Sequence, residues 1–458
     1  MGQKLFTYDS NFQSDSAKLT ISKLTKMLGP DGIACDDDRY LQATENESEI
    51  KLLGGTIFTV SNNIFESDEV TFQLPWIEVL DPTGALTEEQ ATSLAEEAGI
   101  SLTTWTDKFS VTPLYVLVHN ENISSNVLAF PSDAFNAIGK DYYIYICDPT
   151  NGNQTIDQDE VYLITTNASA PSGYTTSNSK CIGGFHFGLV RRTDEYHRPI
   201  NSAGTALGAG WESNVYIGVV PNSVWTVYHR PKCNPKSMVY IGANLWANIY
   251  ICTWTSSDKF KAPAEFGKAI SYPRWWTYGV YSLSNEQKRL PTFAEYCVAA
   301  LGSPSGRDNN IYAWSYSENT SYSKTGYVLM AVSSYNVCDL VGNSWKRVSD
   351  IFSSETVATI DRVGATVPPY NLIVSSYLDV APLFNTSPTS LFGQILEYHT
   401  ANSSTNAGIG IKSMAVGGSY NSGTHAGRRA VCTEYTPFET QTHMGAVWGV
   451  CEGKEVNQ

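Results

Sequence analysis

The chain has 458 residues, of which 42% are hydrophobic, so it is long enough for two or three domains with a sizeable core. Only 16% of the residues are charged, against about 25% in typical soluble domains, whereas 27 Tyr and 11 Trp favour half-buried strands and exclude a disordered chain. The formal net charge of −15 opposes contact with phosphate backbones and anionic surfaces, which argues against nucleic acid and membranes as partners.

Helices are few in the N-terminal part of the predicted fold. A short helix is expected over residues 20–28. A capping box at residues 87–90, Thr-Glu-Glu-Gln, predicts the start of a longer helix that ends near Gly99. Runs rich in Tyr, Val and Ile between turn-forming residues predict short strands. The expected strands of this part are 115–118, 142–146 and 161–164.

A polar segment rich in Ser, Thr and Asn, residues 165–180, is predicted to be the main linker. It separates a β-rich N-terminal region, residues 1–180, from a C-terminal domain, residues 181–458. A weaker boundary within the first region is expected near Pro82.

The C-terminal domain is also expected to be rich in strands. A strand is predicted over residues 239–241. A second capping box, formed by Thr292 and Glu295 directly after Pro291, predicts a helix that ends near Gly302.

Neither the amino terminus nor the cysteines indicate secretion. The sequence MGQKLFTYDSNFQ has no basic region followed by an apolar run, and no stretch of about 18 apolar residues occurs. We therefore expect a soluble chain that is made in a host cytoplasm. The cysteine count is odd and no CxxC occurs, which predicts reduced and mostly buried thiols. The cysteines are Cys35, Cys147, Cys181, Cys233, Cys252, Cys297, Cys338, Cys432 and Cys451.

A series of short motifs follows in a fixed order through the C-terminal domain. The motifs are CIGGFHF (181–187), PNSVWTVYHRP (221–231), KRLPTFAEY (288–296), GSPSG (302–306), DLVGNSWK (339–346), GGSY (417–420) and GRRA (427–430). Any one of them alone is a weak signal, so their specificity comes from the order. Most of these residues are expected to hold the fold and to touch no ligand.

In this order the motifs resemble the formylglycine-generating-enzyme branch of the C-type-lectin fold. Within that branch, the His-Arg-Pro and Gly-Ser-Pro elements resemble the variable proteins of diversity-generating retroelements. The resemblance covers residues 181–458. It implies a fold that is mainly β with a few helices (α+β), in which a β-rich stalk region precedes one C-type-lectin-like domain.

The functional signal lies in residues 418–444, within a variable region expected at about 417–452. This stretch lacks a helical or strand period and mixes aromatic, His, Arg and Asn residues with small ones, as antibody paratopes do. In the family that it resembles, adenine-directed mutagenesis rewrites template codons, commonly AAC. The products end in C and cannot encode Lys, Glu, Gln, Met or Trp. Glu434, Glu439 and Gln441 fail this test, whereas the candidate binding residues pass it.

The candidate receptor-binding residues are Ser419, Tyr420, Asn421, Ser422, Thr424, His425, Arg428, Val431, Thr433, Tyr435, Thr436, Phe438, Thr440, Thr442 and His443. All but Ser419, Ser422, Val431 and Thr436 are expected to lie exposed on one continuous surface. The aromatic residues are expected to be the main anchors. The backbone beneath them is expected to be fixed by Gly417, Gly418, Gly427 and Pro437.

Catalysis is not expected. The activity that founded the fold is copper-dependent oxidation at a pair of cysteines near the C-terminus, but Cys432 and Cys451 are far apart in the sequence. HExxH, GxSxG and Walker patterns are also missing. His186, His197 and His229 are scattered and are expected to be structural. No catalytic residue and no metal site are assigned.

Calcium-dependent glycan binding is a further alternative. It would require a Glu-Pro-Asn or Gln-Pro-Asp motif, and neither occurs. Acidic residues gather at 36–38 and 148–160, and calcium prefers several oxygen ligands on one loop. The spacing at 148–160 does not match an EF-hand, which favours solvated acidic turns. No cofactor is therefore expected, although a structural calcium ion stays open.

The resemblance implies a virion protein at the tip of a phage tail that binds a receptor on the host bacterial surface. Residues 1–180 would supply homotrimerisation and attachment to other tail components. A bacterial surface-displayed binding protein with the same fold is the alternative; it would need an N-terminal lipobox, and Cys35 lies too deep with no apolar run before it. The sequence does not identify the receptor.

Overall fold

The computed structural model describes residues 39–454 apart from several internal segments. Those segments are 61–62, 107–112, 121–129, 131–132, 149–160, 196, 202–203, 205–213, 254–259, 271–275, 307–310, 317, 355–409, 429, 433–436 and 439–442. The helix expected at 20–28 and both acidic clusters, apart from Asp148, lie outside the described residues.

Two small antiparallel sheets open the described chain. Their strands are β1 (Leu41–Ala43), β2 (Glu49–Leu52) and β5 (Val70–Gln73) in one sheet, and β3 (Ile57–Val60) and β4 (Asn63–Glu66) in the other. In β2 every second residue is buried, which is the period of a strand with one face on the core.

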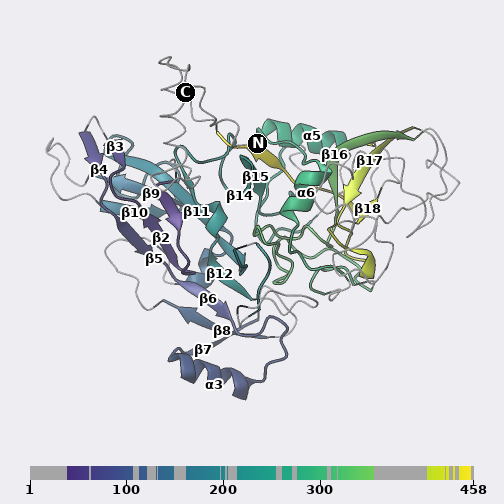
Figure 1. Ribbon diagram of the computed structural model, residues 1–458, viewed down its shortest axis with the longest axis horizontal. Helices are drawn as coiled ribbons and strands as arrows, with labels where there is room; N and C mark the ends of the chain where they lie inside the picture. The colour runs from purple at the N-terminus through teal and green to yellow at the C-terminus, as the bar shows by residue number, and fades with distance from the viewer. Residues whose placement is uncertain are drawn as a thin grey trace, which may run out of the picture.

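An eight-stranded sheet dominates the N-terminal half and occupies the left side of Figure 1. Its strands, in spatial order, are β10 (Val161–Thr165), β9 (Lys140–Cys147), β11 (Ser179–Arg191), β12 (Val215–Val219), β6 (Trp76–Val79), β8 (Leu114–His119) and β7 (Leu102–Trp105), and β13 (Trp225–Thr226) pairs with β11. The predicted strands at 115–118, 142–146 and 161–164 are therefore confirmed.

The predicted domain boundary at residue 180 is wrong. Strand β9 lies between β10 and β11 in one sheet, so the segment between them, residues 166–178, is a loop that joins two strands of the same layer. Pairing of β11 with both β9 and β12 carries the sheet to residue 219. A boundary near Pro82 is not found either, because β6 before it and β8 after it are hydrogen-bonded neighbours. Sequence composition marks loops well, but it cannot show whether a loop leaves its sheet.

The C-terminal half is built around two smaller sheets. The first contains β14 (Met238–Gly242), β15 (Leu245–Asn248) and β20 (Val450–Glu452). The second contains β18 (Val431–Cys432), β17 (Gly410–Val416), β16 (Trp345–Ser354) and β19 (Met444–Val447). The strand predicted at 239–241 is confirmed as part of β14. Figure 1 shows β16, β17 and β18 on the side of the molecule opposite β3 and β4.

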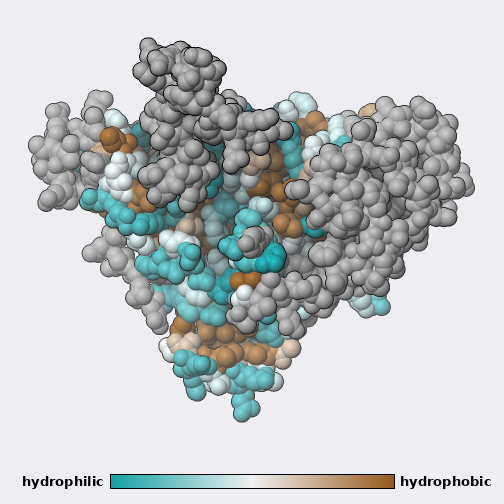
Figure 2. All heavy atoms as spheres, viewed as in Figure 1, coloured by the Kyte–Doolittle hydropathy of each residue, from teal (hydrophilic) through white to brown (hydrophobic). Residues whose placement is uncertain are grey.

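Both capping boxes begin helices as predicted. Helix α3 (Glu88–Ala98) has Thr87 as its N-cap and a left-handed Gly99 at its C-terminus. Helix α6 (Phe293–Ala299) has Thr292 as its N-cap. In Figure 2 the hydrophilic outer surface of α3 lies beside hydrophobic residues over β7 and β8. Two of the described helices were not predicted. Helix α4 (Ala134–Ala137) is a single turn, although Asp133 caps its start, and α5 (Trp276–Asn285) has no acidic residue in its first turn.

One continuous core joins the two halves. A single cluster of buried apolar side chains includes Tyr40 near the start of the described chain, Phe187 of β11, Tyr250 after β15 and Val450 of β20. The halves therefore share buried surface, and neither packs only against itself. Among the described helices, none is both long and apolar enough to cross a bilayer.

The charged residues of the 288–296 motif tie α6 to the last strand. Arg289 donates two hydrogen bonds to the carboxylate of Glu295, at 2.7 and 2.8 Å, and a third to Glu452 of β20 at 2.9 Å. Burial acts to raise the pKa of Glu295, but hydrogen bonds from Arg289 and Thr292 lower it below its usual value. The hydrogen bond from Arg289 is also the main cause that lowers the pKa of Glu452.

Replacing Arg289 with Met should destabilise the protein at pH 7 by about 1–2 kcal/mol, because a bidentate pair and its second partner are lost. Both carboxyl pKa values are lowered in the folded state, so this contribution is present above about pH 4.5 and is lost as the pH falls towards 3. Urea unfolding at pH 7 and at pH 3 measures the difference. A deficit that is equally large at both pH values would contradict the assignment. Lys268→Met, which removes an exposed ion pair with Glu265, is the control.

Candidate functional site

The loop of residues 417–430 connects β17 to β18, and two glycines fix its start. Gly417 and Gly418 have φ values of 89° and 83°. A Cβ atom at Gly417 would lie 2.3 Å from the carbonyl oxygen of Leu340, and one at Gly418 would lie 2.8 Å from Ala426. Only glycine fits both positions, because other residues would meet a clash as well as an unfavourable φ. The loop therefore leaves β17 along one defined path.

The loop is tied to the start of β16. The backbone N–H of Tyr420 donates to the carbonyl oxygen of Asn343 at 2.8 Å, and the N–H of Trp345 donates to the carbonyl oxygen of His443 at 3.2 Å. Farther along, Trp276 donates from its backbone to Pro437 at 3.0 Å and from its indole to Val348 at 2.8 Å. Segments around residues 420, 437 and 443 are thus held against one strand.

A second loop, residues 305–323, supports the first from the side. The N–H of Gly306 donates to the carbonyl oxygen of Ala426 at 2.8 Å, and Gly423 donates to the carbonyl oxygen of Ser315. The rings of Tyr322 and Tyr420 meet edge to face, with centroids 5.0 Å apart. This loop was not predicted as part of the site, because it lies about 100 positions before the variable region. Its aromatic run, IYAWSYSENTSY at 311–322, was a usable signal.

The predicted binding residues differ in exposure. Asn421, Thr424 and Phe438 are exposed, and the side chain of Phe438 keeps 61% of its surface open. Another group is half-buried: Tyr420, Ser422, Arg428 and His443. We call these seven residues the candidate face. Thr433, Tyr435, Thr436, Thr440 and Thr442 lie outside the described residues, as does the side chain of His425.

Two predicted binding residues are buried, so they are removed from the accessible face. Ser419 is 1% exposed, and its hydroxyl is bonded to Asn421 at 2.9 Å and to Ser422 at 3.0 Å. Val431 is also 1% exposed, because it lies in β18 opposite Val416 and packs into the main core. Codon compatibility could not separate them from their neighbours, since it carries no information on burial.

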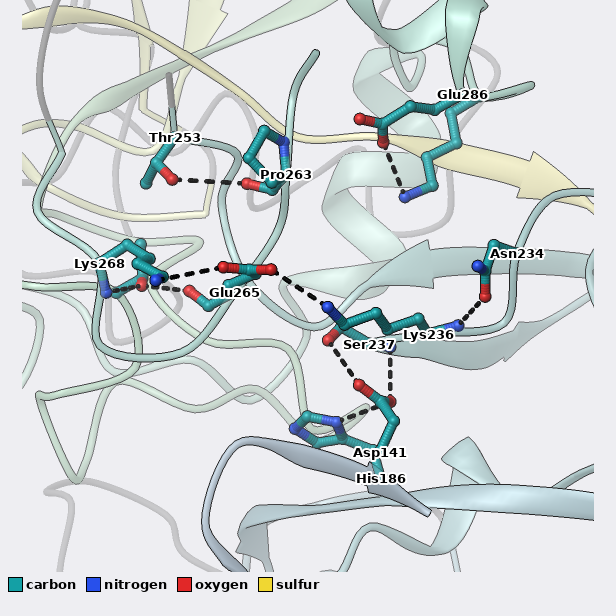
Figure 3. Close-up of polar contacts among 12 residues, drawn as sticks. Asp141, His186, Asn234, Lys236, Ser237, Thr253, Pro263, Glu265, Lys268 and Glu286 are labelled. Atoms are coloured by element: carbon teal, nitrogen blue, oxygen red, sulfur yellow. Dashed lines mark hydrogen bonds and ion pairs between the residues drawn. The ribbon is translucent and has the colours of Figure 1, made fainter. Parts of the chain in front are cut away.

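The described cluster closest to a catalytic arrangement is a buried polar group around Asp141 (Figure 3). Asp141 of β9 accepts hydrogen bonds from the N–H of Ser237 at 2.7 Å and from its hydroxyl at 3.2 Å. His186 of β11 contacts the same carboxylate at 3.0 Å through Nδ1 and the Tyr250 hydroxyl at 2.8 Å through Nε2.

This cluster holds the two halves together. Ser237 and His186 both contact the carboxylate of Asp141. The two imidazole nitrogens of His186 are bonded to Asp141 and Tyr250, so neither of them is placed to activate the Ser237 hydroxyl as a nucleophile. His186 is only 1% exposed. The cluster joins β9 and β11 of the large sheet to residues flanking β14 and β15, which agrees with a structural role for His186.

The chain is similar to known proteins in both sequence and structure. Residues 114–212 match a family model described as the Mtd second domain. The U1 and P3c variants of the Major Tropism Determinant are similar in structure, each with a TM-score of 0.50 over 90% of this chain and 82% of that chain, at 16% and 15% identity. The chain has the fold of the Major Tropism Determinant. The predicted fold class, mainly β with a C-type-lectin-like domain, is thereby confirmed.

A curated relative of this chain is also a phage protein. The "Tail fiber receptor-binding protein" of Bordetella phage BPP-1 is 26% identical over an alignment of 184 residues, and the match covers 36% of this chain. The match spans 42% of the relative's length. The resemblance to a phage tail-tip protein that the ordered motifs implied is therefore confirmed.

Within the Major Tropism Determinant fold, the cysteines are mostly buried, as predicted. Free thiols at Cys147, Cys252, Cys338 and Cys432 are buried, and those at Cys181 and Cys297 are half-buried. Cys233 and Cys451 lie 218 positions apart and no pairing was predicted for them, but they are in contact. In the described part of the chain, no group of three or more His, Cys, Asp or Glu side chains could hold a metal ion.

Proposed function

We propose that this chain is a phage tail-fibre protein that binds a receptor on the host cell surface through the candidate face. The observation that carries the proposal is the combination of a glycine-fixed loop with exposed side chains on the Major Tropism Determinant fold. The relative named as a tail-fibre receptor-binding protein supports the same assignment.

The candidate face has the physical properties that a variable binding surface needs. Substitutions at exposed positions usually change stability by within about ±0.5 kcal/mol, so many residue types can occupy them. Hydrogen bonds to the main chain at Asn343 and Trp345 hold the backbone independently of the side chains that would vary. A rigid backbone also lowers the entropy lost on binding. Diversification of this face by adenine-directed mutagenesis is part of the proposal.

We further propose a virion location, in which the chain forms homotrimers attached to other tail components. The large N-terminal sheet, outside the candidate face, would supply the subunit contacts. Several weak sites acting together raise avidity by roughly 10²–10⁴. Light scattering of the intact protein tests this step. A monomer at micromolar concentration would contradict it, whereas the receptor assignment would stand.

The chain is proposed to bind without turnover and without a cofactor. The polar cluster around Asp141 is buried inside the fold, and the relative from Bordetella phage BPP-1 is named for receptor binding. Metal analysis of the purified protein is the test. Stoichiometric copper held by thiolates would contradict the proposal.

Replacing Phe438 with Ala should weaken binding to host cells by about 30-fold or more, since exposed aromatic anchors dominate binding hot spots. The melting temperature should change by no more than about 1–2 °C, because the side chain is 61% exposed. The measurement is competition by purified full-length protein against adsorption of the phage to its own host. Leu94→Ala on α3, an exposed apolar residue far from β18 in Figure 1, is the matched control.

Equal competition by the Phe438 variant and the wild type would place the binding surface elsewhere. If the variant instead loses its melting transition, Phe438 is part of the core and the candidate face is wrongly drawn. Tyr420→Ala removes both a binding anchor and the ring contact with Tyr322, whereas Tyr322→Leu removes only the ring contact. Comparing the two variants in the same assay separates the two effects.

A further inference from the structure

Two cysteines from distant parts of the chain face each other beside β20, in the sheet of β14, β15 and β20. An antiparallel bridge joins Pro231 to Gly453, so the next same-side pair in this register is Cys233 and Cys451. The backbone N–H of Cys233 donates to the sulfur of Cys451 at 3.3 Å. Both residues belong to one small buried cluster that also contains Trp246.

The register favours a short distance between their Cα atoms. The N–H of Lys232 donates to the carbonyl oxygen of Glu452 at 2.9 Å, which makes that pair a hydrogen-bonded one. Hydrogen-bonded and non-hydrogen-bonded pairs alternate along antiparallel strands, and Cα atoms of the second type lie about 4.5 Å apart. Cys233 and Cys451 occupy a position of the second type. Disulfides span Cα separations of about 4.4–6.8 Å.

We propose that Cys233 and Cys451 are a disulfide-forming pair that closes when the chain meets an oxidising, low-molecular-weight disulfide. The bond would link the segment that leads into β14 with β20, the last strand. It would join positions 218 residues apart and enclose the whole candidate face within one covalent loop. The inference rests on the thiol geometry and does not depend on receptor binding.

The reaction is thiol–disulfide exchange with a compound such as glutathione disulfide. The thiolate of Cys451 attacks one glutathione sulfur, which breaks the S–S bond and releases one glutathione thiolate. The thiol of Cys233 then loses its proton, and its sulfur attacks Cys451 in the mixed disulfide and expels the second glutathione thiolate. Two protein thiols are oxidised, and one glutathione disulfide is reduced to two glutathiones.

The surroundings favour Cys451 as the attacking group. A hydrogen bond with Cys233 is the main cause that lowers the pKa of Cys451 to about 7, while the same contact raises the pKa of Cys233. A thiol with a pKa near the ambient pH is close to the optimum for exchange. Lys232 and Glu452, the sequence neighbours of the two cysteines, are exposed, so the pair lies directly beneath the surface.

Mass spectrometry of the full-length protein tests the proposal. The protein is incubated with excess glutathione disulfide at about pH 8, denatured, alkylated and digested. We expect a cross-linked peptide that contains Cys233 and Cys451, and an intact chain about 2 Da lighter before alkylation, because two hydrogens are lost. The melting temperature should rise by roughly 5 °C and return after reduction, because a disulfide across a long loop constrains the unfolded chain.

Two variants sharpen the test. Cys233→Ser should remove the cross-link and the thermal shift, whereas Cys181→Ser, which changes a half-buried thiol outside the pair, should keep both. Full alkylation of Cys233 and Cys451 in the oxidised wild-type protein would overturn the proposal. A glutathione adduct on Cys451 that never proceeds to the cross-link would also overturn it, since it would show that the sulfurs cannot meet. If Cys233→Ser fails to fold, the presence or absence of the cross-linked peptide in the wild-type protein still decides whether the disulfide forms.

Discussion

Replacing Gly342 with Ala is expected to prevent the C-terminal half from folding, or to destabilise it by more than about 4 kcal/mol. Gly342 has a φ of 74°, and a Cβ atom there would lie 1.5 Å from the carbonyl oxygen of Ala313. The atom that it would meet belongs to the backbone, so no side-chain rotation can relieve the clash. The N–H of Gly342 also donates to Gly417 at 2.9 Å, where the loop of the candidate face begins.

Gly242→Ala is the matched control for this substitution. Gly242 has a φ of 93°, but no atom lies within 4 Å of the position that a Cβ would take. This variant should therefore be destabilised only by the strain of a left-handed backbone, which is about 1–2 kcal/mol. Soluble yield and thermal melting followed by circular dichroism measure both variants. Similar melting temperatures for the two would show that the region around residue 313 can move aside, and that Gly342 is needed only for its φ.

Replacing Asp339 with Asn should destabilise the protein by about 3 kcal/mol, because Lys346 would lose its nearby counter-charge and would have to stay charged and unpaired in the core or release its proton. Both residues are fully buried or nearly so, at 0% and 1% exposure. Burial raises the pKa of Asp339 and lowers that of Lys346, and the attraction between them opposes both shifts. The amide can still accept the hydrogen bond that Asp339 receives from Gly326 at 2.7 Å, so the variant chiefly removes charge.

The double variant Asp339→Asn/Lys346→Met separates charge from packing. Met has a similar length and no charge, so the double variant should recover most of the lost stability, because no buried charge is then left without a counter-charge. Urea unfolding midpoints of the wild type, the two single variants and the double variant form a complete cycle. If the double variant is as unstable as the sum of the single variants, the two groups do not interact. The hydrogen bond from Lys346 to Gly342 would then be the important contact.

Local chemistry made several elements predictable from sequence. Thr87 and Thr292 begin helices because each side chain binds a backbone N–H three residues later, which needs no tertiary partner. The strands at 142–146 and 161–164 were recognisable from their runs of Tyr, Ile and Val. The ordered motifs indicated a C-type-lectin-like fold, and some of their glycines occupy positions that the backbone requires. Gly342 and Gly417, each with a Cβ position filled by a backbone oxygen, are examples.

Contacts between residues far apart in the chain could not be predicted from the sequence. The segment 165–180 has the composition of a linker, yet β9 lies between β10 and β11, so residues 166–178 only join two strands of one sheet. Ser419 and Val431 look like their exposed neighbours, but the fold buries them through side-chain hydrogen bonds and strand pairing. The contact of Cys233 with Cys451 likewise arises from the register of two distant segments.

The family resemblance followed from the order of short motifs along the sequence, and the starts of the main helices followed from residues close together in the chain. The sequence also predicts residues 417–452 as the region of the binding face. The tertiary structure alone decided which side chains of that region reach solvent and which residues support them. The loop at 305–323 and the start of β16 hold the candidate face, although both precede it by about 70 positions or more. Burial depends on what packs against a residue, and in this fold that partner usually comes from far along the chain.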